Sequence, residues 1–257
     1  MPPKPSSPAP LPPARILVRG VNWLGDAIMA TPAFRRLREG LPQARLTLLT
    51  HQKLADLWLH HPSLDAIVTF APGESPWSIA RRLRTEGFDT ALILPNSPRS
   101  ALEAWLARIP RRIGYTRPWR NWFLTEVVAP RPGQVPMRKL STREVRQHFR
   151  QPESEPELAA SYPPTAHHLY DYLHLAASLG ANPEPVAPSL EVVASEVQTV
   201  DAAWLAPLRY QSSATAQTPA PIYLGLNPSA AYGPAKRWPA ESFAAVVREV
   251  SRRLEHC

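Results

Sequence analysis

Asp26 has the residue type and position of an acid–base group. It follows Arg19-Gly-Val-Asn-Trp-Leu-Gly, which joins a predicted strand (residues 14–19) to a predicted helix (residues 26–39). In open α/β sheets, ligands bind at this carboxyl edge of the strands. A carboxylate at a helix N-terminus stays ionised, so Asp26 is predicted to be either a general base for an incoming hydroxyl or only a helix N-cap. The two glycines of this loop are not spaced as a dinucleotide-binding fingerprint.

A second loop, residues 227–239, has the composition of a diphosphate site. It reads Asn227-Pro-Ser-Ala-Ala-Tyr-Gly-Pro-Ala-Lys-Arg-Trp-Pro, between a predicted strand (221–226) and a predicted helix (240–255). Small residues allow close backbone approach, and Lys236 would neutralise phosphate charge. The Gly-Lys-Ser/Thr of a Walker A loop is missing. Alternatively, Lys236 and Arg237 form a solvated cap, and Trp238 with Pro239 forms a hydrophobic staple at the helix entry.

Alternating strands and helices must position these two loops. The apolar runs predict strands at 14–19, 44–50, 65–70 and 89–94, with helices at 26–39, 53–60, 77–86, 99–108 and 167–179, the last ending at Gly180. Continuous apolar runs are typical of parallel strands covered on both faces, and the alternation predicts a doubly wound α/β domain. The pattern restarts at residue 221 with one βα unit, which cannot bury its own strand, so the chain is expected to be truncated.

Proline-rich stretches set the predicted domain boundaries, since the chain has 32 prolines. Residues 1–13 are predicted to be a disordered tail, and 14–205 an N-terminal domain with a flexible insertion at 130–165. Residues 206–220 are predicted to be a linker, and 221–257 the first βα unit of a second domain.

The net charge of the chain indicates what kind of partner it binds, and its cysteine content indicates in which cellular compartment it acts. The net charge of +8 indicates an anionic partner, which leaves nucleic acid, a phosphorylated lipid head group or a nucleotide open. The one cysteine, Cys257, cannot build a disulfide framework, and the N-terminus lacks the apolar region of a secretory signal. No stretch is long and apolar enough to span a bilayer. A cytoplasmic location is therefore predicted, with any membrane contact peripheral.

Four motifs in order resemble glycosyltransferase family 9, and most closely its heptosyltransferase II group: residues 22–32, 94–101, 109–115 and 227–239. The run from Tyr232 to Pro239 is the most specific. The resemblance implies a GT-B type α/β fold, with the Rossmann-like N-terminal domain complete and the second Rossmann-like domain only begun. It also implies inverting transfer of L-glycero-D-manno-heptose from ADP-heptose to the lipopolysaccharide inner core, on a lipid A–Kdo–heptose acceptor at the inner membrane surface.

The resemblance also implies roles for individual residues. Asp26 matches the family's catalytic aspartate, and Lys236 the lysine on the donor diphosphate. The other expected donor-binding residues are Tyr232, Gly233 and Ser229, of which Ser229 replaces the family's usual glycine. The expected acceptor-binding residues are Trp23, Asn96, Ser97 and Arg99. No Asp-x-Asp motif is present, so no metal or other cofactor is expected.

Other interpretations remain open at the level of sequence. His167, Asp171 and His174 share a helix face, with His168 nearby, as a metal site would require, although a packed or solvated histidine face is the alternative. Each arginine of the first domain either contacts an anionic acceptor or lies in solvent: Arg35, Arg36, Arg38, Arg99, Arg111, Arg112, Arg117 and Arg120. A basic nucleic-acid binder lacks any recognised binding motif here, so no nucleic acid is expected. A truncated fragment that binds the acceptor without transferring sugar is the main competing function.

Overall fold

The computed structural model describes residues 14–132, 134, 141, 143, 146, 163–206, 224–228 and 237–254. The chain divides into two compact units, residues 1–193 and 194–257. The predicted tail and nearly all of the predicted linker lie outside the described residues. The predicted domain boundaries therefore stay predictions.

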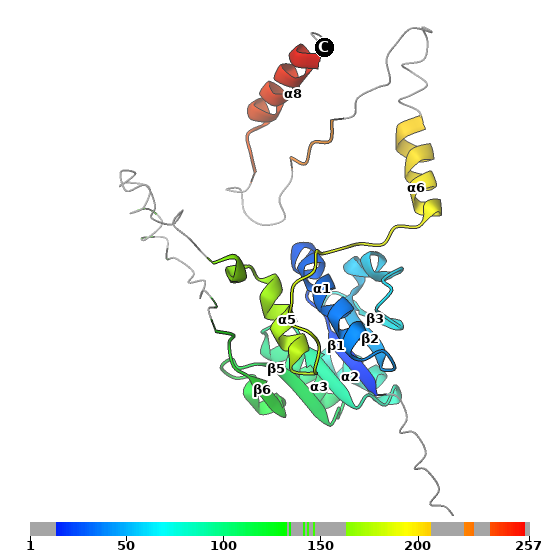
Figure 1. Ribbon diagram of the computed structural model, residues 1–257, viewed down its shortest axis with the longest axis vertical. Helices are drawn as coiled ribbons and strands as arrows, with labels where there is room; N and C mark the ends of the chain where they lie inside the picture. Colours follow the sequence, from blue (N-terminus) through cyan, green and yellow to red (C-terminus); the bar gives the residue numbers. More distant parts are fainter. Residues whose placement is uncertain are drawn as a thin grey trace, which may run out of the picture. The chain divides into compact units, whose positions relative to one another are not determined.

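The first unit is built on a six-stranded parallel sheet in the order β3-β2-β1-β4-β5-β6 (Figure 1). This order belongs to doubly wound folds and confirms the predicted parallel α/β sheet. The order reverses between β1 and β4, the switch point where such sheets bind ligands. The strands are β1 (Arg15–Arg19), β2 (Arg45–His51), β3 (Ala66–Phe70), β4 (Thr90–Ile93), β5 (Arg111–Tyr115) and β6 (Glu126–Val128).

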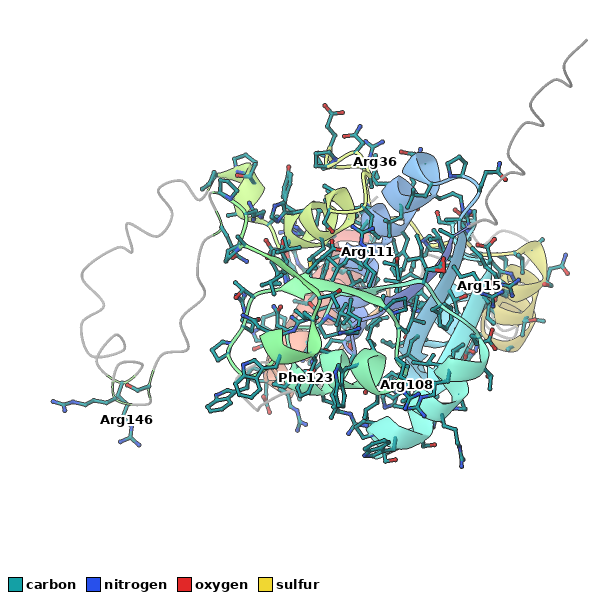
Figure 2. All side chains as sticks on the ribbon, turned by 90° about the horizontal axis from the view of Figure 1, so that it is seen from below. Arg15, Arg36, Arg108, Arg111, Phe123 and Arg146 are labelled. Atoms are coloured by element: carbon teal, nitrogen blue, oxygen red, sulfur yellow. The ribbon has the colours of Figure 1, made fainter. Side chains whose placement is uncertain are left out.

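Helices cover both faces of this sheet. Helices α1 (Leu24–Gly40) and α5 (Leu169–Ala177) lie side by side on one face, and α2 (Pro76–Thr85) and α3 (Pro98–Leu106) on the other. Figure 2 accordingly shows Arg36 of α1 on one side of the sheet and Arg108, which follows α3, on the other. The helix expected at 53–60 is instead two short 3-10 helices, η1 (Gln52–Leu54) and η2 (Asp56–Trp58). Two more are η3 (Asn121–Phe123) and η5 (Pro164–Ala166).

Alternate side chains of the central strands pack into two separate core layers on opposite faces of the sheet. Ile16 and Val18 of β1 pack with Phe34 and α5, whereas Leu17 packs with α2 and α3. Strands buried on both faces in this way read as continuous apolar runs, which is why the sequence revealed them. Gly180 lies beyond the end of α5 with φ +87°, a left-handed conformation that glycine adopts without a Cβ clash, as expected for a helix stop.

The sequence did not predict β5 and β6. Strand β5 reads Arg-Arg-Ile-Gly-Tyr, and its arginines obscure the apolar pattern because only Ile113 and its C-terminal neighbours are buried. It is held by backbone pairing with β4, while β6 is a three-residue edge strand next to it.

The second unit contains α6 (Ala194–Val200), the π-helical turn η6 (Asp201–Leu205) and α8 (Ala240–Leu254), which confirms the helix predicted at 240–255. The prediction of a strand at 221–226 is wrong for residues 224–226, which belong to no strand. A strand requires a pairing neighbour.

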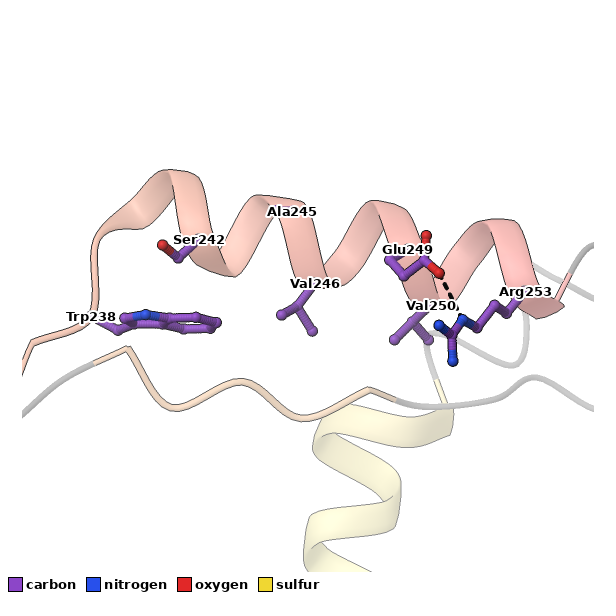
Figure 3. Close-up of a pocket in the computed structure, with 7 residues that line it drawn as sticks. All are labelled: Trp238, Ser242, Ala245, Val246, Glu249, Val250 and Arg253. Carbon is purple, nitrogen blue, oxygen red and sulfur yellow. Dashed lines mark hydrogen bonds and ion pairs between the residues drawn. The ribbon is translucent and has the colours of Figure 1, made fainter. Parts of the chain in front are cut away.

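Trp238 packs edge-on against Phe243, with their ring centroids 5.1 Å apart, so the predicted staple is present. Figure 3 shows a hollow along α8 lined by Trp238, Val246 and Val250 among others.

Candidate functional site

Three loops lie side by side at the carboxyl edge of the sheet. Arg19, Ile93 and Gly114 are register neighbours at the ends of β1, β4 and β5. The segments that follow them, residues 20–23, 94–97 and 116–120, therefore meet at the switch point.

A buried ion pair fixes the first loop. Arg19 Nε lies 2.8 Å from Glu103 Oε2 of α3, and both side chains are almost fully buried. The same guanidinium donates to the Gly20 carbonyl and, at 3.1 Å, to Asn22 Oδ1. Gly20 is needed for close packing, because a Cβ there would lie 2.8 Å from Leu48 Cδ1. The loop is thus held by the buried Arg19–Glu103 ion pair and by the packing of Gly20 against the core.

Asp26 lies in the first turn of α1 and is not the N-cap. Trp23 holds the N-cap position, and its side chain makes no capping hydrogen bond. The Asp26 carboxylate is 31% exposed, and its Oδ1 lies 3.7 Å from His168 Nδ1. The N-cap interpretation is therefore wrong, and Asp26 is a partly exposed carboxylate at the helix N-terminus that faces a histidine.

His168 connects Asp26 to a second carboxylate. Its Nε2 lies 3.7 Å from Asp171 Oδ2. The Asp171 carboxylate is buried and held by Arg131 Nε at 2.7 Å and Gln134 Nε2 at 3.0 Å. A carboxylate–imidazole–carboxylate row thus runs from α1 to α5. Arg131 and Gln134 fall within the range predicted as a flexible insertion, most of which lies outside the described residues.

The sequence singled out a different histidine face, and His168 was only noted as a neighbour. His174 Nδ1 lies 2.9 Å from the Tyr115 hydroxyl, which itself donates to the Asp171 carbonyl at 2.8 Å. Burial lowers the pKa of His174. Burial, with smaller contributions from Asp26 and Asp171, raises the pKa of Tyr172 beside His168. In the described part of the chain, no group of three or more histidine, cysteine, aspartate or glutamate side chains is arranged so that it could hold a metal ion.

Asn96, a predicted acceptor-binding residue, is backed by a buried cation. Arg120 Nη1 donates to Asn96 Oδ1 at 3.1 Å, and Arg120 is fully buried without a carboxylate partner among the described residues. Burial, then the charge of Arg117, lowers the pKa of Arg120 to about 10. Gly114 makes room for it, because a Cβ there would lie 2.5 Å from Nη2. The expectation of a solvated role is thus wrong for Arg120.

The Arg120 contact fixes the orientation of the Asn96 amide. A guanidinium has only donors, so the Asn96 oxygen must face Arg120. Asn96 is exposed, and among the described residues no hydrogen bond from its amide nitrogen is seen, so this nitrogen can donate to a ligand.

The other predicted acceptor-binding residues divide into two kinds. Ser97 is the N-cap of α3 and accepts from the Ser100 amide, while Arg99 pairs with Glu103 at 3.3 Å and donates to the Glu74 carbonyl. These contacts give both a structural role. Trp23 is 54% exposed, and Lys53 Nζ lies 5.0 Å from its ring centroid, which leaves an aromatic face at the loop.

Most remaining arginines are engaged by the protein itself. Arg35 and Arg36 pair with Glu39, Arg38 with Asp65, and Arg111 with Glu126. Arg112 donates to backbone carbonyls, and Arg117 to the Thr116 carbonyl. The net positive charge of the chain is thus not gathered into one exposed arginine cluster by these residues.

The predicted donor-binding residues Ser229, Tyr232, Gly233 and Lys236 lie outside the described residues. Their placement stays a prediction. In the residues that the structure describes, no helix has both the length and the apolar character needed to cross a bilayer.

The comparisons with known proteins assign the chain to a family. The model of glycosyltransferase family 9 (heptosyltransferase) matches residues 76–254, so the chain belongs to that family. Lipopolysaccharide heptosyltransferase 2 of Escherichia coli is 27% identical over 92% of this chain and 60% of the relative, and that of Salmonella typhimurium is 26% identical over the same shares. The chain thus spans about 60% of the length of these curated relatives.

Solved structures share the fold. The ADP-heptose lipopolysaccharide heptosyltransferase II of Escherichia coli matches with a TM-score of 0.62 at 24% identity, over 93% of this chain and 62% of that one. A family 9 glycosyltransferase from Veillonella parvula matches with a TM-score of 0.64 at 22% identity, over 93% and 60%. These matches support the predicted GT-B type α/β architecture.

Proposed function

We propose that this chain is an inverting heptosyltransferase that moves L-glycero-D-manno-heptose from ADP-heptose to the lipopolysaccharide inner core. The observation that supports it most is the partly exposed Asp26 carboxylate at the switch point of a family 9 sheet. The acceptor is a lipid A–Kdo–heptose at the inner face of the cytoplasmic membrane, which a cytoplasmic protein reaches by peripheral contact.

The proposed reaction needs one base and a stabilised leaving group. Asp26 accepts the proton of the acceptor hydroxyl as that oxygen attacks the anomeric carbon of the heptose. The bond from this carbon to the diphosphate breaks, and ADP leaves with the electron pair. Lys236, with Tyr232, Gly233 and Ser229, is proposed to hold the diphosphate and offset its charge. No metal is part of this scheme.

On the acceptor side, Trp23 and Asn96 are the proposed contacts. The exposed indole of Trp23 offers a flat apolar surface to a sugar ring. The Asn96 amide nitrogen offers a donor to an anionic or hydroxyl oxygen, because Arg120 binds the amide oxygen. Ser97 and Arg99 contribute by holding the loop that carries Asn96 in its shape.

The substitution Asn96→Asp is expected to raise the thermal stability of the protein and to weaken its binding of the acceptor. The new carboxylate pairs with the buried Arg120, so the melting temperature should rise by a few degrees. The variant loses the outward donor and adds negative charge, so the acceptor KM should rise about tenfold or more. Thermal denaturation and steady-state kinetics measure the two effects. A lower melting temperature would contradict the assignment of Arg120 as an uncompensated cation.

The function itself is tested by incubating the protein with ADP-heptose and heptosyl-Kdo2-lipid A and following ADP release and product mass. Transfer, with UDP-glucose inactive as donor, supports the proposal. Tight acceptor binding without any transfer would instead support the competing function, a chain that only binds the anionic acceptor.

A further inference from the structure

His168 lies where a proton leaving Asp26 would go. Its Nδ1 is 3.7 Å from Asp26 Oδ1 and its Nε2 is 3.7 Å from Asp171 Oδ2, so the imidazole separates two carboxylates that come from different helices. Catalytic hydrogen bonds are often longer than usual in a ligand-free protein and shorten when substrate binds. The row therefore has the order, though not yet the contact distances, of a proton path.

The far end of this row is fixed. Asp171 is only 8% exposed and is held by Arg131 and Gln134, whereas His168 is 47% exposed on its side chain. The His168 ring also lies 4.8 Å from that of Tyr172, which is itself buried. The His168 ring is therefore accessible to water, and its Nε2 lies near the fixed Asp171 carboxylate.

We propose that His168 receives at Nδ1 the proton that Asp26 takes from the acceptor hydroxyl, and that it positions the Asp26 carboxylate for that step. This inference rests on the proposed function. Imidazole is in general a stronger base than a carboxylate, and this intrinsic difference favours proton transfer in this direction.

The proton balance of the step closes. The acceptor O–H bond breaks as the new C–O bond forms, and ADP departs with the electrons of the cleaved bond. The proton passes from the Asp26 oxygen to His168 Nδ1. The resulting imidazolium lies between the Asp26 and Asp171 carboxylates, with Nε2–H directed at Asp171. It then loses its proton to water, which restores both groups.

The matched variants are His168→Asn and His167→Asn. His168 is the N-cap of α5 without a side-chain cap hydrogen bond, and Asn is a favoured N-cap, so the first variant should fold. His167 Nδ1 accepts from the Leu169 amide, a bond that an Asn oxygen can replace, so the second variant is a control for the loss of a neighbouring histidine.

The first measurement is independent of activity. Long-range 1H–15N spectra of the histidine rings, recorded on the 257-residue chain at one fixed pH, follow the two ring nitrogens of His168 in the unaltered protein and in Asp26→Asn. Loss of the carboxylate should change the resonance of His168 Nδ1, because this nitrogen lies 3.7 Å from Asp26 Oδ1. His167→Asn should leave that resonance in place. An identical Nδ1 resonance in Asp26→Asn would overturn the proposed coupling.

The second measurement is the pH profile of heptosyl transfer. His168→Asn should lower kcat about tenfold or more, keep the acceptor KM within about twofold, and move the acidic limb to lower pH. A pH profile that coincides with that of the unaltered protein would refute the proton path. If the unaltered protein transfers no heptose, the proposed function fails, and the ring spectra alone decide whether Asp26 and His168 are coupled.

Discussion

Replacing Asp26 by Asn lowers heptosyl transfer by about 10²–10⁴-fold, the usual contribution of a general base, and leaves the fold intact. An amide has the same shape as the carboxylate but cannot accept the proton of the attacking hydroxyl. Asp26 is not a helix cap, and its carboxylate has one partner, at 3.7 Å, among the described residues. The free energy of unfolding should therefore change by less than about 1 kcal/mol.

The measurement is the initial rate of ADP release under saturating substrates, together with thermal denaturation of each variant. Asp56→Asn is the matched control, because Asp56 is an exposed acid in the first turn of η2. Its rate should equal that of the unaltered protein. Near-normal turnover by Asp26→Asn would remove Asp26 from the mechanism.

Glu103→Ala is expected to destabilise the first unit by about 3–5 kcal/mol, since it leaves the buried Arg19 charge without its carboxylate. Arg19 also holds the Gly20 carbonyl and Asn22, so the loop that leads to Asp26 loses its support. Chemical denaturation followed by circular dichroism measures this loss.

Two comparisons identify the cause. Glu39→Ala breaks the exposed pairs with Arg35 and Arg36 and should cost less than about 1 kcal/mol. The double variant Arg19→Met/Glu103→Leu removes both charges and should recover most of the stability lost by Glu103→Ala. A Glu103→Ala protein as stable as Glu39→Ala would show that the buried pair does not hold the loop.

Periodicity predicted the elements whose side chains bury on a regular pattern. It identified β1 to β4 and the helices α1, α2 and α3 because both faces of these strands pack into the core, and it placed Asp26 at the edge where β1 ends. It missed β5 because the arginines of that strand are held by partners remote in sequence, such as Glu126. Local pattern carries no information about such partners.

The site residues that the sequence missed are those defined by packing between elements. His168 meets Asp26 only because α5 lies against α1, and the sequence instead favoured the helix face that includes His174. Arg120 was indistinguishable from the solvated arginines, since its burial depends on the space left by Gly114 in the neighbouring strand. The spacing of His168 and Asp171, three residues apart at a helix start, was the one local signal for this site.

The position of β1 and β4 in the sheet has a consequence for the hydrogen exchange of the backbone. Both strands are paired on their two sides, whereas β3 and β6 are paired on one. Amides of doubly paired strands exchange with deuterium only through large-scale opening, while edge strands exchange by local fraying. Because the loop that leads to Asp26 continues from β1 and the loop that carries Asn96 continues from β4, fraying of the sheet edges leaves the spacing between those two loops unchanged.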